Sequence, residues 1–129
     1  AGLRVGYSIS SPKIADYLNR IRQPFNVNHI AQSAAIAALS DETFLARSVA
    51  ANTNGLLQLT QGFNRLGLSF ISSSANFVSV KVVDAGVTYQ QLLEKGFIVR
   101  PVEMPGYLRV SVGTRNENEE FLDALKSVL

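Results

Sequence analysis

Three arginines lie at the edges of predicted β-strands, among apolar residues, where an uncompensated charge is costly. Arg4 stands within Gly-Leu-Arg-Val-Gly, Arg100 ends an apolar run, and Arg109 interrupts the apolar pattern of residues 107–112. The planar guanidinium group can hold a carboxylate or a phosphate through two parallel hydrogen bonds. These positions therefore indicate anion sites, although an internal ion pair or a side chain that reaches out to solvent fits the same pattern.

Other residues that could carry chemistry give weaker signals. His29 could act as a general base, but no partner residues surround it in the sequence, so a structural role is the simpler interpretation. Asn76, at the start of a predicted strand, could orient a ligand or belong to a turn. The serines at 72–74 lack the context of a hydrolase nucleophile, the glycines form no phosphate-binding or dinucleotide-binding motif, and the acidic residues form no metal set. Composition and spacing alone identify no reaction.

Apolar periodicity predicts the elements that must position these residues. The predicted helices span residues 13–21, 29–39, 41–66, 88–94 and 117–129. The predicted strands span residues 3–9, 68–71, 75–83, 97–100 and 107–112. After residue 28 the order is helix, helix, strand, strand, helix, strand, strand, helix. This order predicts an α/β sandwich with a small, largely antiparallel sheet and helices on one face.

Glycines, prolines and polar residues punctuate this pattern. Serines followed by Pro12 predict the start of the first helix, and Asn116 is the expected cap of the last. Residues 24–28 lack a helical period and form a candidate domain boundary. Gly55 and Gly62 each weaken the helix predicted over residues 41–66, at about 1 kcal/mol against alanine.

The composition excludes several classes of protein. The 129 residues are 47% apolar and 17% charged, which predicts one packed domain, or a small domain with a tail. A net charge of +2 does not argue for nucleic-acid binding, and no apolar run approaches the roughly 20 residues that span a bilayer. With no cysteine and one histidine, a disulfide framework and a thiolate or multi-histidine metal site are excluded, and a cytoplasmic location is expected. The chain opens on an apolar pattern without methionine, so we expect a piece of a longer protein.

Several stretches resemble the fold-type I pyridoxal-phosphate aminotransferases. The opening AGLRVGY is similar to the segment that follows the cofactor lysine in that family. The similarity narrows to histidinol-phosphate aminotransferases in GFIVRP at residues 96–101 and YLRVSVGTRNE at residues 107–117. QPFNVN at residues 23–28 and ANF at residues 75–77 fit the same group. The resemblance covers essentially the whole chain, in order.

This resemblance implies both an architecture and a set of roles. Residues 1–25 would end the large cofactor-binding domain with its last strand and helix, and residues 26–129 would form the small C-terminal α/β domain. Arg4 would bind the phosphate of pyridoxal 5'-phosphate, Arg109 the anionic group of the substrate, and Arg100 would help to hold a substrate phosphate. The lysine that bonds to the cofactor would precede Ala1, so we expect no catalytic residue in this chain and no activity from it alone.

The implied function is the conversion of histidinol phosphate and 2-oxoglutarate to imidazole-acetol phosphate and glutamate in histidine biosynthesis. The implied enzyme is a cytoplasmic homodimer without nucleic-acid or membrane partners. Its loop at residues 102–106 is shorter than in many members of the family. The alternatives are a threonine-phosphate decarboxylase or an aromatic aminotransferase of the same fold, and a non-catalytic domain that binds small molecules. A free-standing binding domain would start naturally near residue 1, whereas a fragment would expose an apolar strand at residues 3–9.

Overall fold

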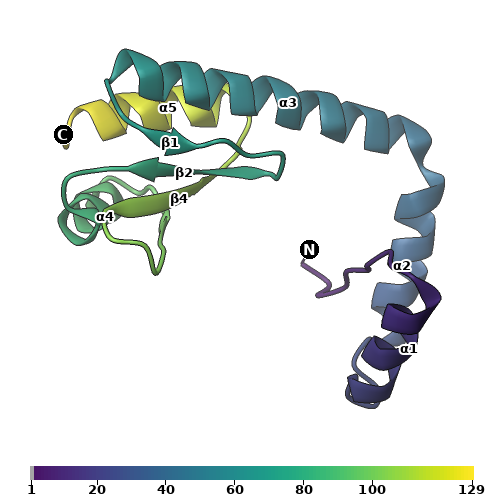
Figure 1. The fold of residues 1–129 in the computed structure, drawn as a ribbon. Helices are drawn as coiled ribbons and strands as arrows, with labels where there is room; N and C mark the ends of the chain where they lie inside the picture. The colour runs from purple at the N-terminus through teal and green to yellow at the C-terminus, as the bar shows by residue number, and fades with distance from the viewer. Residues whose placement is uncertain (1) are drawn as a thin grey trace. The chain divides into compact units, whose positions relative to one another are not determined.

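The structure is a computed structural model that describes residues 2–129 (Figure 1). It separates into two compact units, Ala1–Ala46 and Arg47–Leu129, called here the first and the second unit. The predicted division into residues 1–25 and 26–129 concerns the domains of a longer protein, and it stays a prediction.

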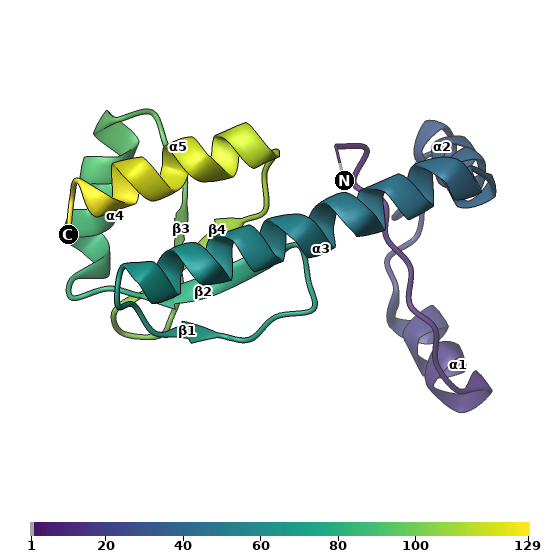
Figure 2. The same ribbon diagram turned by 90° about the horizontal axis from the view of Figure 1, so that it is seen from above.

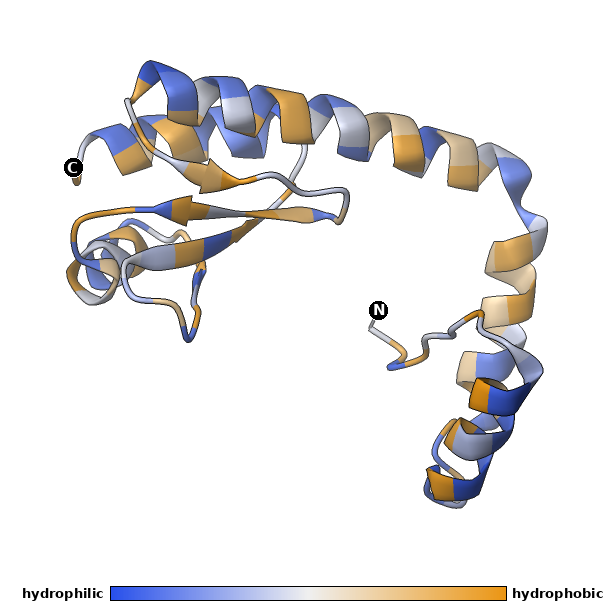
Figure 3. Ribbon diagram, viewed as in Figure 1, coloured by the Kyte–Doolittle hydropathy of each residue, from blue (hydrophilic) through white to orange (hydrophobic). Residues whose placement is uncertain are grey.

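The first unit begins with a segment that lacks regular secondary structure, residues 4–11. The strand predicted at residues 3–9 is therefore wrong for this chain. None of the described strands pairs with the segment, and a lone strand would leave its backbone groups without ladder partners. Helix α1 (Pro12–Ile21) then forms as predicted, with Ser11 as N-cap and Pro12 in its first turn. Figure 3 shows apolar and polar residues alternating along α1.

Two further helices follow, each begun by a polar cap. In α2 (His29–Ser40), the Asn28 side chain accepts a hydrogen bond of 2.9 Å from the Ala31 amide. In α3 (Glu42–Arg65), the Asp41 carboxylate accepts one of 2.9 Å from the Phe44 amide. Gly67, with a φ of 71°, follows the end of α3 in the left-handed conformation that glycine adopts most easily. Both helices lie within one or two residues of their predicted bounds.

The second unit contains an antiparallel sheet, as predicted, and its strands lie in the order β1-β2-β4-β3. Its strands are β1 (Phe70–Ile71), β2 (Phe77–Lys81), β3 (Arg100–Pro101) and β4 (Tyr107–Ser111). The strand predicted at residues 97–100 is shifted, because the ladder begins at Arg100 and includes Pro101. A proline is tolerated there because β3 is an edge strand, which needs no amide donor on its outer side.

Helices pack on one face of this sheet. Figure 2 shows α3 and α5 (Arg115–Lys126) side by side across it, and α4 (Ala85–Glu94) contacts β3, β4 and α5. All three helices bury side chains in one core with β2 and β4. The fully buried members include Leu59, Phe63, Val78, Val80, Leu92, Leu108 and Leu125.

Two helix starts differ from the prediction because side-chain caps decide them. Asp84 caps α4 by accepting a 2.9 Å hydrogen bond from the Val87 amide, so the helix starts three residues before Thr88. Thr114, not Asn116, caps α5, so the predicted cap is wrong. Thr114 and Glu117 form a capping box, in which each side chain accepts a hydrogen bond from the other residue's amide.

Side chains along β2 and β4 point alternately into the core and to the other face of the sheet. Val78, Val80, Leu108 and Val110 are buried toward the helices. The residues between them form what we call the open face: Phe77, Ser79, Lys81, Tyr107, Arg109 and Ser111.

Among residues 2–129, no helix combines the length and apolar character that crossing a membrane requires. The same residues contain no group of three or more His, Cys, Asp or Glu placed to hold a metal ion.

Candidate anion-binding site

Arg100 and Arg109 lie directly opposite each other in the antiparallel pairing of β3 with β4. Because Leu108 and Val110 are anchored in the core, Arg109 must project from the open face. Directly opposite residues share a face, with Cβ atoms about 4.5–5.5 Å apart. The structure therefore brings these two predicted site residues together on the open face, and we call them the arginine pair.

No acidic side chain neutralises the arginine pair within residues 2–129. An ion pair joins Arg20 to Asp16 at 2.7 Å on α1, but neither Arg100 nor Arg109 forms one with a described residue. Among these residues, no carboxylate or carbonyl accepts a hydrogen bond from Arg100 or Arg109. Like charges directly opposite each other in a sheet destabilise it, so an anion bound between the two would remove a repulsion. Among residues 2–129, Arg100 and Arg109 therefore do not form the internal ion pair that the sequence left open.

Phe77 is the third member of the site. It lies opposite Ser111, two residues along β4 from Arg109, so it is a diagonal neighbour of Arg109 on the open face. The Arg109 Cζ stands over the Phe77 ring, 4.9 Å from its centroid. That position gives a cation–π attraction, which leaves the N–H groups of Arg109 available to a ligand. Sequence reasoning missed this role, although the alternation of residues 77–81 would have placed Phe77 on the face of Ser79.

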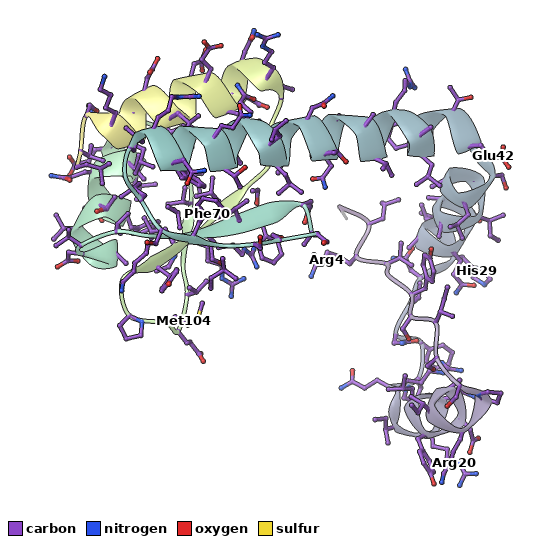
Figure 4. All side chains as sticks on the ribbon, turned by 45° about the horizontal axis from the view of Figure 1, so that its top comes forward. Arg4, Arg20, His29, Glu42, Phe70 and Met104 are labelled. Carbon is purple, nitrogen blue, oxygen red and sulfur yellow. The ribbon has the colours of Figure 1, made fainter. Side chains whose placement is uncertain are left out.

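Arg4, the third predicted anion-binding residue, belongs to the first unit. It lies in the segment before α1, it is exposed, and its φ of 58° is one that non-glycine residues rarely adopt (Figure 4). Within the described residues it has no ion pair. An exposed guanidinium group without a carboxylate partner fits the phosphate of a cofactor, the role predicted for Arg4.

The two weaker candidates take structural positions. His29 is the exposed first residue of α2, and no described group forms a hydrogen bond with its side chain (Figure 4). The backbone carbonyl of Asn76 accepts a 2.9 Å hydrogen bond from the Val112 amide. Asn76 therefore extends the pairing of β2 with β4 beyond Phe77, and this backbone bond supports the strand that carries the ring.

A buried amide network holds the far end of β4. Asn118 is 2% exposed; its Oδ1 accepts a 2.9 Å hydrogen bond from the Gly113 amide, and its Nδ2 donates to Gln58 Oε1 at 3.1 Å. The network thereby joins the end of β4 to α3 and α5. Beside it, hydrogen bonds from the Thr114 backbone and then its side chain lower the pKa of Glu117 below its ordinary value.

Known proteins match the chain along its whole length. It is 57% identical to the histidinol-phosphate aminotransferase of Methylobacillus flagellatus and 55% identical to histidinol-phosphate aminotransferase 2 of Pseudomonas aeruginosa. All of this chain is covered in both comparisons, but it spans only 36% of the length of either curated relative.

A solved structure and a family model agree with those relatives. The structure of histidinol-phosphate aminotransferase from Sinorhizobium meliloti, in complex with pyridoxal-5'-phosphate, matches with a TM-score of 0.78 and 28% identity. That match covers 98% of this chain and 37% of the other. The family model of aminotransferase class I and II matches residues 1–125. The chain therefore belongs to the aminotransferase class I and II family.

Proposed function

We propose that this chain is the C-terminal part of an enzyme that converts histidinol phosphate and 2-oxoglutarate to imidazole-acetol phosphate and glutamate. The observation that carries the proposal is the arginine pair, two guanidinium-bearing residues in register on one sheet face without an acidic partner among the described residues. A phosphate monoester carries a charge near −2 at neutral pH and offers three acceptor oxygens. Arg100 and Arg109 together match that charge and supply a fork of donors each.

The same pair suits the second substrate. A carboxylate of 2-oxoglutarate carries one charge and takes one bidentate arginine, the role we assign to Arg109. Arg100 would then matter more for the phosphate-bearing donor than for 2-oxoglutarate. Anchoring the charged end of either substrate in turn holds its reacting end in a fixed orientation, which lowers the entropic cost of reaction.

The family and the Sinorhizobium meliloti relative support pyridoxal 5'-phosphate as the cofactor. When bound, that cofactor withdraws electrons and stabilises negative charge on a substrate carbon. The part of this chain in its binding is Arg4, whose exposed guanidinium group would hold the cofactor phosphate. None of Lys13, Lys81, Lys95 and Lys126 stands at the motif position of the cofactor lysine, so the 129 residues alone should not transaminate.

Four further features belong to this proposal. The chain would contribute residues 1–25 to a large domain and residues 26–129 to a small one. The whole enzyme would be a homodimer, and it would work in the cytoplasm in histidine biosynthesis. The high identity to the two bacterial relatives supports the type of enzyme, and these features are what we expect of that type.

The test is a transamination assay of the whole protein, with histidinol phosphate or phenylalanine as donor to 2-oxoglutarate. We expect a strong preference for histidinol phosphate. Activity with phenylalanine alone would identify an aromatic aminotransferase, and decarboxylation of threonine phosphate without transamination would identify a decarboxylase. No activity with any of the three would favour a binding domain and contradict the proposal.

Variants of the whole protein connect this activity to the arginine pair. We expect Arg109→Ala to lower kcat/KM for histidinol phosphate about 10- to 100-fold, because it removes charge-assisted hydrogen bonds worth about 1.5–3 kcal/mol. Arg65→Ala removes an exposed arginine at the end of α3, away from the open face, and should leave kcat/KM unchanged. Equal losses in the two variants would mean that general charge, and not the pair, attracts the substrate.

A further inference from the structure

We propose that Phe77 is a positioning residue, which holds the Arg109 guanidinium group in the geometry that binds the substrate anion. This inference rests on the function proposed above and adds to it a residue that no part of that proposal uses. It starts from the 4.9 Å distance between the Arg109 Cζ and the centroid of the Phe77 ring.

The ring is held in place by the sheet. Phe77 is the first residue of β2 and pairs with Ser111, while Val78 next to it is fully buried in the core. Beyond it, the Val112 amide donates a 2.9 Å hydrogen bond to the Asn76 carbonyl. The backbone is therefore paired on both sides of the ring's attachment point, and strand alternation directs the half-buried ring to the open face.

Arg109 needs such support because no hydrogen bond or ion pair among the described residues orients its side chain. Its side chain has several rotatable bonds, and its opposite neighbour is Arg100, whose charge repels it. A carboxylate partner would hold Arg109 but would also neutralise it and occupy its donors. An aromatic ring attracts the cation through its face and accepts none of the in-plane hydrogen bonds. Phe77 can thus orient Arg109 while its charge and its donor fork stay available to a phosphate or carboxylate.

Substitutions in the whole holoenzyme separate this role from simple packing. Phe77→Leu keeps an apolar side chain but removes the ring, and it should raise KM for histidinol phosphate about three- to fivefold with little change in kcat. Phe77→Tyr keeps the ring face and should restore KM. The matched control is Phe70→Leu in β1, whose ring packs against Phe63 with centroids 6.0 Å apart (Figure 4). This control should lower stability and leave KM unchanged.

A double-mutant cycle tests whether Phe77 acts through Arg109. In an Arg109→Ala background, Phe77→Leu should cause no further rise in KM, because the cation that it orients is gone. The dissociation constant of inorganic phosphate for the holoenzyme, measured by calorimetry, should follow the same pattern. That measurement does not depend on turnover.

The outcomes distinguish this inference from the proposed function. A wild-type enzyme that does not use histidinol phosphate contradicts the proposed function. In that case the phosphate dissociation constants of the wild type and the variants still test whether Phe77 positions Arg109. If Phe77→Leu binds phosphate as tightly as wild type, or if its effect is the same with and without Arg109, the positioning role is wrong. If Phe70→Leu raises KM as much as Phe77→Leu, the effect is one of general sheet stability and the inference is again wrong.

Discussion

The two units of this chain differ in how far they bury their apolar side chains. In the second unit, Leu59, Phe63 and Leu108 are fully buried in one core. In the first unit, Ala31 is the one buried apolar residue among residues 2–46, and Phe25 is 99% exposed. The arginine pair therefore stands on a sheet that its own unit supports from behind, whereas Arg4 stands on a segment without a ladder partner. An anion site is preorganised only where packing fixes the backbone that carries it.

Separating the units gives the largest effect that we expect. A peptide of residues 47–129 should unfold cooperatively on heating, because it contains the whole core and all four strands. A peptide of residues 1–46 should show weak helicity and no cooperative transition, since isolated short helices are marginal in water. Circular dichroism during a thermal scan measures both. A sharp thermal transition of the 1–46 peptide at micromolar concentration would contradict the view that the first unit lacks a core of its own.

Single core truncations sharpen the same contrast. Phe63→Ala should lower the free energy of unfolding by about 3–5 kcal/mol, because it leaves a cavity where the ring packs against the core. Ile36→Ala in α2, where the side chain is 68% exposed, should change it by less than about 0.5 kcal/mol. Urea denaturation of each variant provides the values. If the two variants lose the same free energy of unfolding, the Ile36 side chain contributes more to packing than its exposed fraction indicates.

The smallest effect concerns Glu117 and depends on pH. Its pKa is lowered in the folded chain, so its carboxylate stabilises α5 above its unfolded pKa, and this contribution is lost as pH falls through the folded pKa. Glu117→Gln should therefore reduce stability at pH 7, and its difference from wild type should shrink in acid. Glu120→Gln, on the same helix but outside the capping box, serves as the control. A Glu117→Gln stability deficit that stays unchanged as the pH is lowered would argue against the ionised capping box.

Apolar periodicity predicted the order of the elements from residue 28 onward, because alternation and helical spacing are local signals. It could not predict where helices begin, since this depends on which polar side chain reaches a free amide, as Thr114 does in place of Asn116. Helix propensity counts Gly55 and Gly62 only as a cost to α3 and does not reveal what they contribute to packing. A Cβ on Gly62 would overlap the Leu122 side chain, and one on Gly55 would overlap Val112, so the glycines allow close packing of α3.

The candidate site was predictable only in part. Each arginine could be recognised from its apolar surroundings in the sequence. The alternation of side chains along the strand alone places Arg109 on the sheet face away from the core. That Arg100 is its partner depends on the strand register, which long-range packing decides and no local pattern reveals. The contact between the Phe77 ring and Arg109 depends on the pairing of β2 with β4, which the sequence alone does not reveal.

The register pairing of Arg100 with Arg109 bears on how this family can change over time. The hydrogen-bond ladder sets the spacing of the pair, and it continues into the connecting loop, where the Val102 amide donates a 3.4 Å hydrogen bond to the Tyr107 carbonyl. Because loop length helps to fix the register of a hairpin, only insertions and deletions that keep this pairing leave both guanidinium groups in place. A slip of one residue in the ladder, by contrast, would turn one arginine toward the core and abolish the site in a single step. The length of the loop can therefore diverge only in ways that leave the pairing of β3 with β4 intact.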